Sequence, residues 1–191
     1  MDNFSLRPKI GVMGSAKAPA GEHAAVLKSL ANRLGNTVAQ HGCVLVTGAT
    51  TGLPDLTSRA ARSAGAMTIG ISPAQSRDEH VSRYALPDDG AEVIIYTGFG
   101  LKGRNVINIR ACDIVIIVGG GIGTLNEFTI AFDEGMVIGV LEGTGGIADR
   151  VREIAQMSER EVRSVVLYDS DPEALVNACL EELHRRQRSA D

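Results

Sequence analysis

The residue types best suited to binding chemistry gather in one glycine-rich run, Gly119-Gly120-Gly121-Ile122-Gly123-Thr124. Glycine permits positive φ and a close approach of the backbone to a ligand. The run follows an apolar segment and precedes a helical pattern, so the first N–H groups of that helix point at whatever binds there. Together with the positive end of the helix dipole they favour an anion, most simply a phosphate. A plain turn needs only one or two glycines, and no Gly-Lys-Ser/Thr follows, so a P-loop is not indicated.

Charged and amide side chains flank this run at helical spacing. Glu127 lies three residues after Thr124, on the first turn of the expected helix, and faces the same mouth. Arg104 and Asn108 form an i, i+4 pair on the preceding helix. An arginine fork beside a phosphate turn, with a carboxylate opposite, is a plausible site. An ordinary ion pair between Arg104 and Glu127 is the open alternative.

The elements that must position these residues alternate between strand and helix along the whole chain. This alternation predicts an α/β fold with a doubly wound parallel sheet, a Rossmann-like three-layer sandwich, over a single domain 1–191. Strands are expected at 9–13, 43–47, 66–71, 92–97, 113–118, 137–141 and 164–168, and helices at 22–40, 54–64, 103–111, 124–133, 147–157 and 170–186. The irregular stretch 72–90 is expected to be a surface excursion that could reach over a ligand.

In such sheets, ligands bind beyond the carboxyl ends of the strands, where the strand order reverses. Two further strand ends carry glycine, at Gly14-Ser15 and at the loop that begins with Gly48. Gly14, Ser15 and Gly48 are therefore expected to contact the ligand, together with Asn108 and the glycine-rich run.

Composition narrows the partners and the compartment. The formal net charge of −4 over 191 residues gives no basic footprint, so no nucleic-acid partner is expected. No apolar run approaches the roughly 20 residues of a membrane-spanning helix, and no signal peptide is evident, so no membrane partner and a cytoplasmic location are expected. The four histidines lack metal-ligand spacing, and the three cysteines are far apart, so no metal site is expected.

The segment from Arg104 to Glu127, RNVINIRACDIVIIVGGGIGTLNE, resembles the superfamily of the LONELY GUY cytokinin-activating phosphoribohydrolases and the molybdenum-cofactor carrier proteins. The LONELY GUY signature is Pro-Gly-Gly-x-Gly-Thr-x-x-Glu, preceded by a helix with a catalytic arginine. That arginine falls on Arg104, and the signature falls on Gly119, Gly120, Gly121, Gly123, Thr124 and Glu127. The resemblance extends more loosely from Lys9 to Glu153. It implies the same fold and a homo-oligomer, at least a dimer; the apolar content of helices 103–111 and 124–133 agrees with such an assembly.

Three departures separate this chain from the hydrolase signature. Gly119 stands where the family has proline, Asn126 replaces the first glutamate of a Glu-Glu pair, and Lys102-Gly103 replaces a His-Glu before the arginine. With the pattern Arg104-Asn105-x-x-Asn108, the chain is more similar to the carrier branch and its bacterial relatives.

Two hypotheses about function follow. The first is a binding or carrier protein for a phosphorylated, nucleotide-like small molecule, with molybdenum cofactor or a nucleoside monophosphate as the candidate ligand and no cofactor required. The second is a phosphoribohydrolase that cleaves the N-glycosidic bond of nucleoside 5′-monophosphates. In that case Glu127 stabilises the oxocarbenium-like transition state or activates water, and Arg104 orients the ribose and Glu127. Lysine decarboxylation is disfavoured, because no lysine lies in a setting typical of a pyridoxal-phosphate Schiff base.

Overall fold

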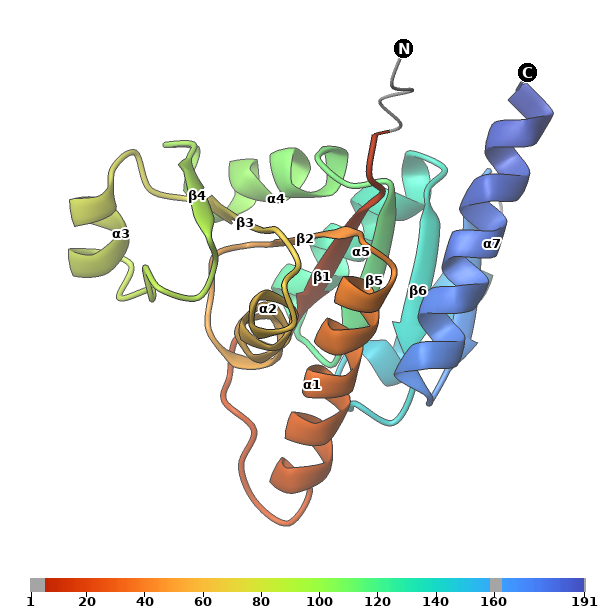
Figure 1. Cartoon of the computed structure of the whole chain (residues 1–191), viewed down its shortest axis with the longest axis horizontal. Helices are drawn as coiled ribbons and strands as arrows, with labels where there is room; N and C mark the ends of the chain where they lie inside the picture. Colours follow the sequence, from red (N-terminus) through yellow and green to blue (C-terminus); the bar gives the residue numbers. More distant parts are fainter. Residues whose placement is uncertain (1–5, 159–162, 191) are drawn as a thin grey trace.

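The computed structural model describes residues 6–158 and 163–190, and in them seven parallel strands form one sheet (Figure 1). The strands are β1 (Lys9–Gly14), β2 (Val44–Thr47), β3 (Thr68–Ser72), β4 (Val93–Tyr96), β5 (Ile114–Val118), β6 (Val137–Leu141) and β7 (Val165–Asp169). Their order across the sheet is β4-β3-β2-β1-β5-β6-β7. The sheet therefore grows in one direction from β1 to β4 and in the other from β5 to β7, which confirms the predicted doubly wound α/β fold.

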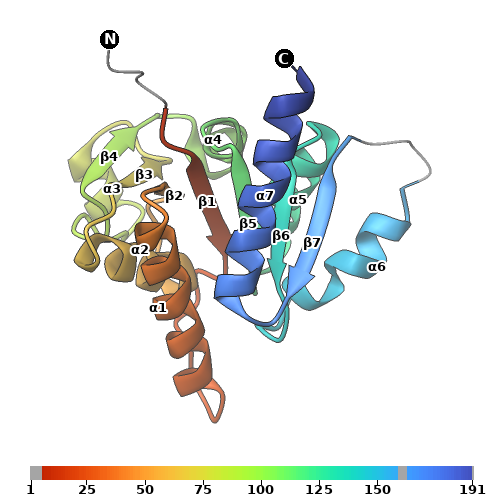
Figure 2. The same ribbon diagram turned by 45° about the vertical axis from the view of Figure 1, so that its right-hand side comes forward.

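Helices cover both faces of this sheet. They are α1 (Ala24–Gln40), α2 (Gly52–Ser63), α3 (Arg77–Ser82), α4 (Gly100–Arg110), α5 (Ile122–Asp133), α6 (Val151–Gln156) and α7 (Pro172–Ala190), with a short 3-10 helix at Ala148–Arg150 before α6. Helices α1, α2 and α7 pack together on one face, and Figure 2 shows α7 lying along β5 and β6. Helices α4 and α5 pack together against the other face.

The central strand β5 shows why the sheet has two cores. Its five residues are all buried, and side chains alternate between the faces of a strand. Ile114 and Ile116 join the core beneath α1, α2 and α7, whereas Val115 and Ile117 join the core beneath α4 and α5. A strand buried on both sides reads as a continuous apolar run, which is how the sequence DIVIIV is recognised.

The excursion 72–90 differs from the expected irregular loop, because it contains the helix α3. Ser76 is the N-cap of this helix and accepts a hydrogen bond from the N–H of Glu79 at 3.2 Å. The Glu79 carboxylate in turn accepts from the N–H of Gln75 at 2.8 Å. This reciprocal arrangement resembles a capping box, and the spacing Ser-x-x-Glu is a helix signal in the sequence.

The strand order reverses between β1 and β5, and this point fixes where the site lies. The two strands pair in parallel register, with Ile10 beside Ile114 and Gly14 beside Val118. A Cβ on Gly14 would lie 2.0 Å from the carbonyl oxygen of Val118, so a side chain there would push the two strand ends apart. Beyond the pair, the chain turns from β1 toward α1 on one face and from β5 toward α5 on the other.

Candidate functional site

A cavity of about 530 Å³ lies beyond the carboxyl ends of β1 and β5. Its volume is within the usual range of small-molecule sites, roughly 300–1,000 Å³. Nine of the residues predicted for the site line it: Gly14, Ser15, Gly48, Arg104, Gly120, Gly121, Gly123, Thr124 and Glu127. Residues from four separate segments thus meet at the place where a doubly wound sheet binds its ligands.

The N-terminus of α5 forms one wall of this cavity. Gly121 is the N-cap residue and has no side chain to cap the helix, and the first turn contains no acidic residue. The first hydrogen bond of the helix runs from the N–H of Leu125 to the carbonyl of Gly121 at 2.9 Å. The N–H groups before Leu125 therefore have no partner within the helix, and the positive end of its dipole faces the cavity.

The glycines of the run differ in what they do. A Cβ built on Gly121 or Gly123 meets no atom within 4 Å, and neither glycine has positive φ. Gly120 has φ +95° and a Cβ there would lie 2.2 Å from Thr124 Oγ1, so this position requires glycine for the fold itself. Gly121 and Gly123 consequently leave an open approach to the backbone N–H groups.

Two predicted site residues lie outside the cavity wall. Gly119, with φ +60°, donates its N–H to Thr144 Oγ1 at 2.8 Å, and its carbonyl accepts from the N–H of Ala148 at 3.1 Å. Asn108 is fully buried behind the wall formed by Arg104 and Glu127. Gly119 therefore shapes the turn, and Asn108 supports the buried pair.

Arg104 and Glu127 approach each other across the cavity wall. Arg104 NH1 lies 3.7 Å from Glu127 Oε1, and the two side chains are 8% and 9% exposed. Arg104 Nε is buried and has no hydrogen-bond partner in the part of the chain that the structure describes. Gly48 provides the space for the guanidinium, because a Cβ on Gly48 would lie 1.7 Å from Arg104 NH1. Arg104 is therefore paired with Glu127, as predicted, while its Nε–H donor has no acceptor among the described residues.

Burial disfavours both charges of this pair. Desolvation raises the pKa of the Glu127 carboxyl above its ordinary value, although Arg104, Asn108 and Lys102 oppose that change. Desolvation likewise lowers the pKa of Arg104, against the attraction of Glu127. Both directions have one cause: at 3.7 Å the attraction within the pair compensates only part of the cost of removing two charges from water.

The Asn108 amide can serve either member of the pair. With Nδ2 toward Glu127, it donates to Oε1 at 3.4 Å and to the Met13 sulfur at 3.0 Å. With the amide turned over, Nδ2 donates to the carbonyl of Thr47 and Oδ1 accepts from Arg104 NH1, both at 3.2 Å. The second orientation satisfies both ends of the amide, so Asn108 positions Arg104 from behind.

Sequence reasoning missed two lysines at the cavity. Lys17 and Lys102 line it from the loop after β1 and from the first turn of α4, and both are exposed. Neither forms an ion pair with any residue in the described part of the chain. Lys102 lies two positions before Arg104, at the start of the same helix. That position could have indicated from the sequence that Lys102 lines the site. The remaining unpredicted lining residues are Val12, Met13, Ala16, Thr50, Pro54, Leu101 and Asn105.

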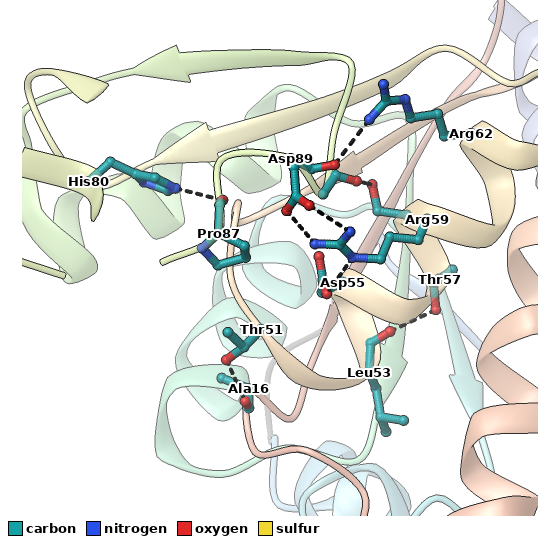
Figure 3. A network of polar contacts seen from close by, with 12 residues as sticks. Ala16, Thr51, Leu53, Asp55, Thr57, Arg59, Arg62, His80, Pro87 and Asp89 are labelled. Atoms are coloured by element: carbon teal, nitrogen blue, oxygen red, sulfur yellow. Dashed lines mark hydrogen bonds and ion pairs between the residues drawn. The ribbon is translucent and has the colours of Figure 1, made fainter. Parts of the chain in front are cut away.

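The loops next to the cavity are held by specific hydrogen bonds (Figure 3). Thr51 Oγ1 donates to the carbonyl of Ala16 at 2.6 Å, which joins the loop after β2 to the loop after β1. Asn105 Nδ2 donates to Asn126 Oδ1 at 2.8 Å and joins α4 to α5. The four segments of the site are thereby joined in two pairs.

The excursion 72–90 is fixed away from the cavity. Arg59 on α2 binds the carboxylates of Asp55 and Asp89, and the ring of buried His80 is hydrogen-bonded to the carbonyl of Pro87 at 2.9 Å (Figure 3). No residue of 72–90 lines the cavity. The segment that was expected to be able to reach over a ligand is thus held against α2 and lines no part of the cavity.

Two kinds of feature are absent from the described residues, 6–158 and 163–190. No helix within them is long and apolar enough to cross a membrane. No group of three or more histidine, cysteine, aspartate or glutamate side chains within them could hold a metal ion.

The acidic composition led to the expectation that this protein has no nucleic-acid partner, and that expectation is wrong. DNA processing protein A from Helicobacter pylori, which binds single-stranded DNA, matches 92% of this chain over 81% of its own, with a TM-score of 0.61 and 16% identity. At this identity the likeness shows the fold alone. It does show that this fold serves nucleic acid in another protein, so a net charge of −4 is no ground for excluding such a partner.

Two solved structures are more similar in sequence. The molybdenum cofactor binding protein from Rippkaea orientalis is 26% identical, with a TM-score of 0.70, and the match covers 93% of this chain and 98% of that chain. The molybdenum cofactor carrier protein from Chlamydomonas reinhardtii is 28% identical, with a TM-score of 0.72, over 95% and 99% of the two chains. These likenesses confirm the superfamily that the segment 104–127 predicts.

A curated relative is also similar. An uncharacterized protein from Archaeoglobus fulgidus is 34% identical over 134 residues, which cover 70% of this chain and 80% of the relative. The model of the SLOG cluster4 family matches residues 7–176, from β1 into α7, and so includes every segment of the cavity. This protein belongs to the SLOG cluster4 family.

Proposed function

We propose that this protein binds and carries a phosphorylated, nucleotide-like small molecule, whose phosphate lies at the N-terminus of α5. One observation carries the proposal: an uncapped helix N-terminus opens into a cavity that, among the described residues, is lined by three cations, Lys17, Lys102 and Arg104, and by a single carboxylate, that of Glu127. The chain as a whole has a net charge of −4, so the cavity has the opposite sign to the protein. Such a cavity attracts an anion.

The cavity fits a ligand larger than inorganic phosphate. Its volume of about 530 Å³ leaves space beside the helix N-terminus, and Val12, Met13, Pro54 and Leu101 give part of its wall an apolar surface. A phosphate on the backbone N–H groups of residues 121–124, with a flat heterocycle against this surface, uses both parts of the cavity.

Molybdenum cofactor is one ligand of this kind, and the similar proteins from Rippkaea orientalis and Chlamydomonas reinhardtii bind or carry it. The residues present fit its phosphate end, because residues 121–124 and Arg104 offer donors to an anion. All three cysteines are buried, and none lines the cavity. The protein would therefore hold this cargo by its phosphate and leave the metal end without a thiolate ligand.

Calorimetric titration with molybdenum cofactor and with AMP tests the proposal. Saturable binding of either, weakened at least tenfold in Arg104→Ala and retained in Arg33→Ala, is the expected result; Arg33 lies on α1 and forms its ion pairs with Asp171 and Glu173, outside the cavity. If the wild-type protein binds neither compound at any accessible concentration, the proposal is wrong.

The buried carboxylate supports a second candidate function, hydrolysis of the N-glycosidic bond of a nucleoside 5′-monophosphate. Glu127 is 7% exposed, lines the cavity beside Arg104, and has a raised pKa, as catalytic carboxylates in apolar surroundings do. In this function water attacks the anomeric carbon, the bond to the base breaks, and Glu127 stabilises the positive charge on the ribose. Release of free base from AMP, abolished in Glu127→Ala, would establish the activity; absence of product at high protein concentration would dismiss it.

A further inference from the structure

A second cavity, of about 270 Å³, lies beside the first. It is bounded by the loop after β1, with Pro19 and Ala20, by Leu27 of α1 and Leu53 of α2, and by Gly146 after β6. Leu27 and Leu53 belong to the core beneath α1, α2 and α7, whereas Met13 in the first cavity belongs to the core beneath α4 and α5. Val12 in the first cavity shares the core of Leu53, so the first cavity reaches both faces of the sheet, and the second lies on the side of α1 and α2.

The two cavities meet at three residues, because Ser15, Lys17 and Gly120 line both. The N–H of Ser15 donates to the carbonyl of Val118 at 3.1 Å, so this junction lies directly over the paired ends of β1 and β5. Gly120 continues into the N-terminus of α5, where the phosphate is proposed to bind. A ligand phosphate at that N-terminus therefore lies at the entrance to both cavities.

The backbone beside the junction is shaped to keep the second cavity open. The carbonyl of Gly120 accepts from the N–H of Ile147 at 3.0 Å, so the chain after β6 is drawn against the glycine run. Gly146 has φ +59°, and a Cβ there would lie 2.2 Å from the Gly120 oxygen. Glycine is required at this contact, and any side chain would separate the two loops and alter the junction.

The topology gives the reason for two adjoining cavities. At the reversal of strand order, the chain leaves β1 toward one face and β5 toward the other, and the crevice between these departures is open to both. A ligand with a substituent on only one side of its phosphate would fill only the first cavity. A ligand with two substituents joined through phosphate would fill both.

We infer that the ligand is two-armed: a dinucleotide-like molecule whose bridging pyrophosphate lies over Ser15, Lys17 and Gly120, with one arm in each cavity. This inference rests on the proposed function and names its ligand class. The larger cavity, with Arg104 and Glu127, holds the first nucleoside or pterin arm. The smaller one, between Pro19, Leu27 and Leu53, holds a second flat heterocycle by apolar contact. Lys17 at the junction neutralises charge on the bridge.

The test compares three adenine compounds by calorimetry: AMP, ADP and diadenosine 5′,5″-pyrophosphate. ADP contains the pyrophosphate without a second arm, so it separates the effect of charge from that of the second cavity. The variant Ala20→Trp fills the second cavity from its exposed loop without touching the first. Glu22→Trp, an exposed position nearby on the same loop that lines neither cavity, is the matched control.

The expected result is that the wild-type protein and Glu22→Trp bind the diadenosine compound at least tenfold more tightly than ADP, and that Ala20→Trp binds it no more tightly than ADP. If AMP and ADP bind but the diadenosine compound has no advantage, the inference is overturned and the proposed function stands. An advantage that persists in Ala20→Trp also overturns it. If none of the three compounds binds, the inference is overturned, and the proposed function is decided by the titration with molybdenum cofactor.

Discussion

The most informative single substitution is Gly48→Ala, because it acts on Arg104 without touching that residue. The new Cβ would lie 1.7 Å from NH1 and 2.6 Å from Cζ of Arg104, both far below any real contact distance. Gly48 does not have positive φ, so alanine introduces no backbone strain there. The atoms that must move are the far end of a flexible side chain, so the guanidinium is displaced and the fold is retained.

The expected loss of affinity follows from the contacts that Arg104 gives up in the free protein and in the complex with ligand. In the folded protein without ligand, Arg104 gives up a 3.7 Å pair with Glu127 and a 3.2 Å hydrogen bond to Asn108 Oδ1, while alanine reduces the entropy of the unfolded chain, so the free energy of unfolding falls by about 1–2 kcal/mol. In the complex, the displaced guanidinium gives up a charge-assisted hydrogen bond to the ligand, worth roughly 1.5–3 kcal/mol. Affinity for the phosphorylated ligand therefore falls roughly 10- to 150-fold.

A double-mutant cycle measured by calorimetric titration checks this mechanism. Arg104→Ala alone should lose a comparable affinity, and adding Gly48→Ala to it should lose nothing more, because the group that is displaced is no longer there. Thermal unfolding of each variant verifies the fold. The reasoning is refuted if Gly48→Ala binds as the wild-type protein does, or if it costs the same affinity in the Arg104→Ala background.

Three further predictions concern the same cavity. Gly123→Ala meets open space, so the melting temperature should stay level or rise, as expected for alanine in a helix, while ligand affinity falls at least tenfold; equal affinity would show that the ligand does not approach this backbone. Lys102→Ala should weaken binding by about twofold to fivefold, less at high salt, and Lys28→Ala on the exposed side of α1 should not; equal effects in titrations would contradict a role for Lys102. Burial raises the pKa of Glu127 above 4.5, so over the pH range just above that value the folded protein holds a proton that the unfolded chain has released. The free energy of unfolding therefore falls as the pH rises. Urea unfolding of the wild type and of Glu127→Gln between pH 4.5 and 7.5 should show the wild type losing free energy of unfolding relative to the variant, and a relative gain would refute the direction.

Most of the fold could be predicted from the sequence because its signals are local. The apolar run before the glycines identifies β5, and the alternation of strands and helices identifies the doubly wound sheet. Helix α3 was missed although Ser76 and Glu79 have capping-box spacing, because its six residues lie among prolines and charges that resemble a loop.

The grouping of the candidate site residues could be predicted where they lie near one another along the chain, and not where they lie far apart. Arg104, Glu127 and the glycine run share one segment and one helix pair, so spacing sufficed to bring them together. Gly119 was assigned to the ligand, but its N–H is used by Thr144, 25 residues away, and no local pattern reveals that bond. The second cavity depends on Gly146 meeting Gly120, which is also a long-range contact.

The central claim is that an anion binds to the backbone at the start of α5, facing Arg104 and Glu127. The most direct measurement is a crystal structure of the protein with a bound nucleotide. The account predicts phosphate oxygens about 2.7–3.2 Å from the backbone nitrogens of residues 121–124, with the Arg104 guanidinium turned toward them. A nucleotide whose phosphate binds elsewhere and leaves those nitrogens without a ligand, or an Arg104 that points away from the cavity, would contradict it.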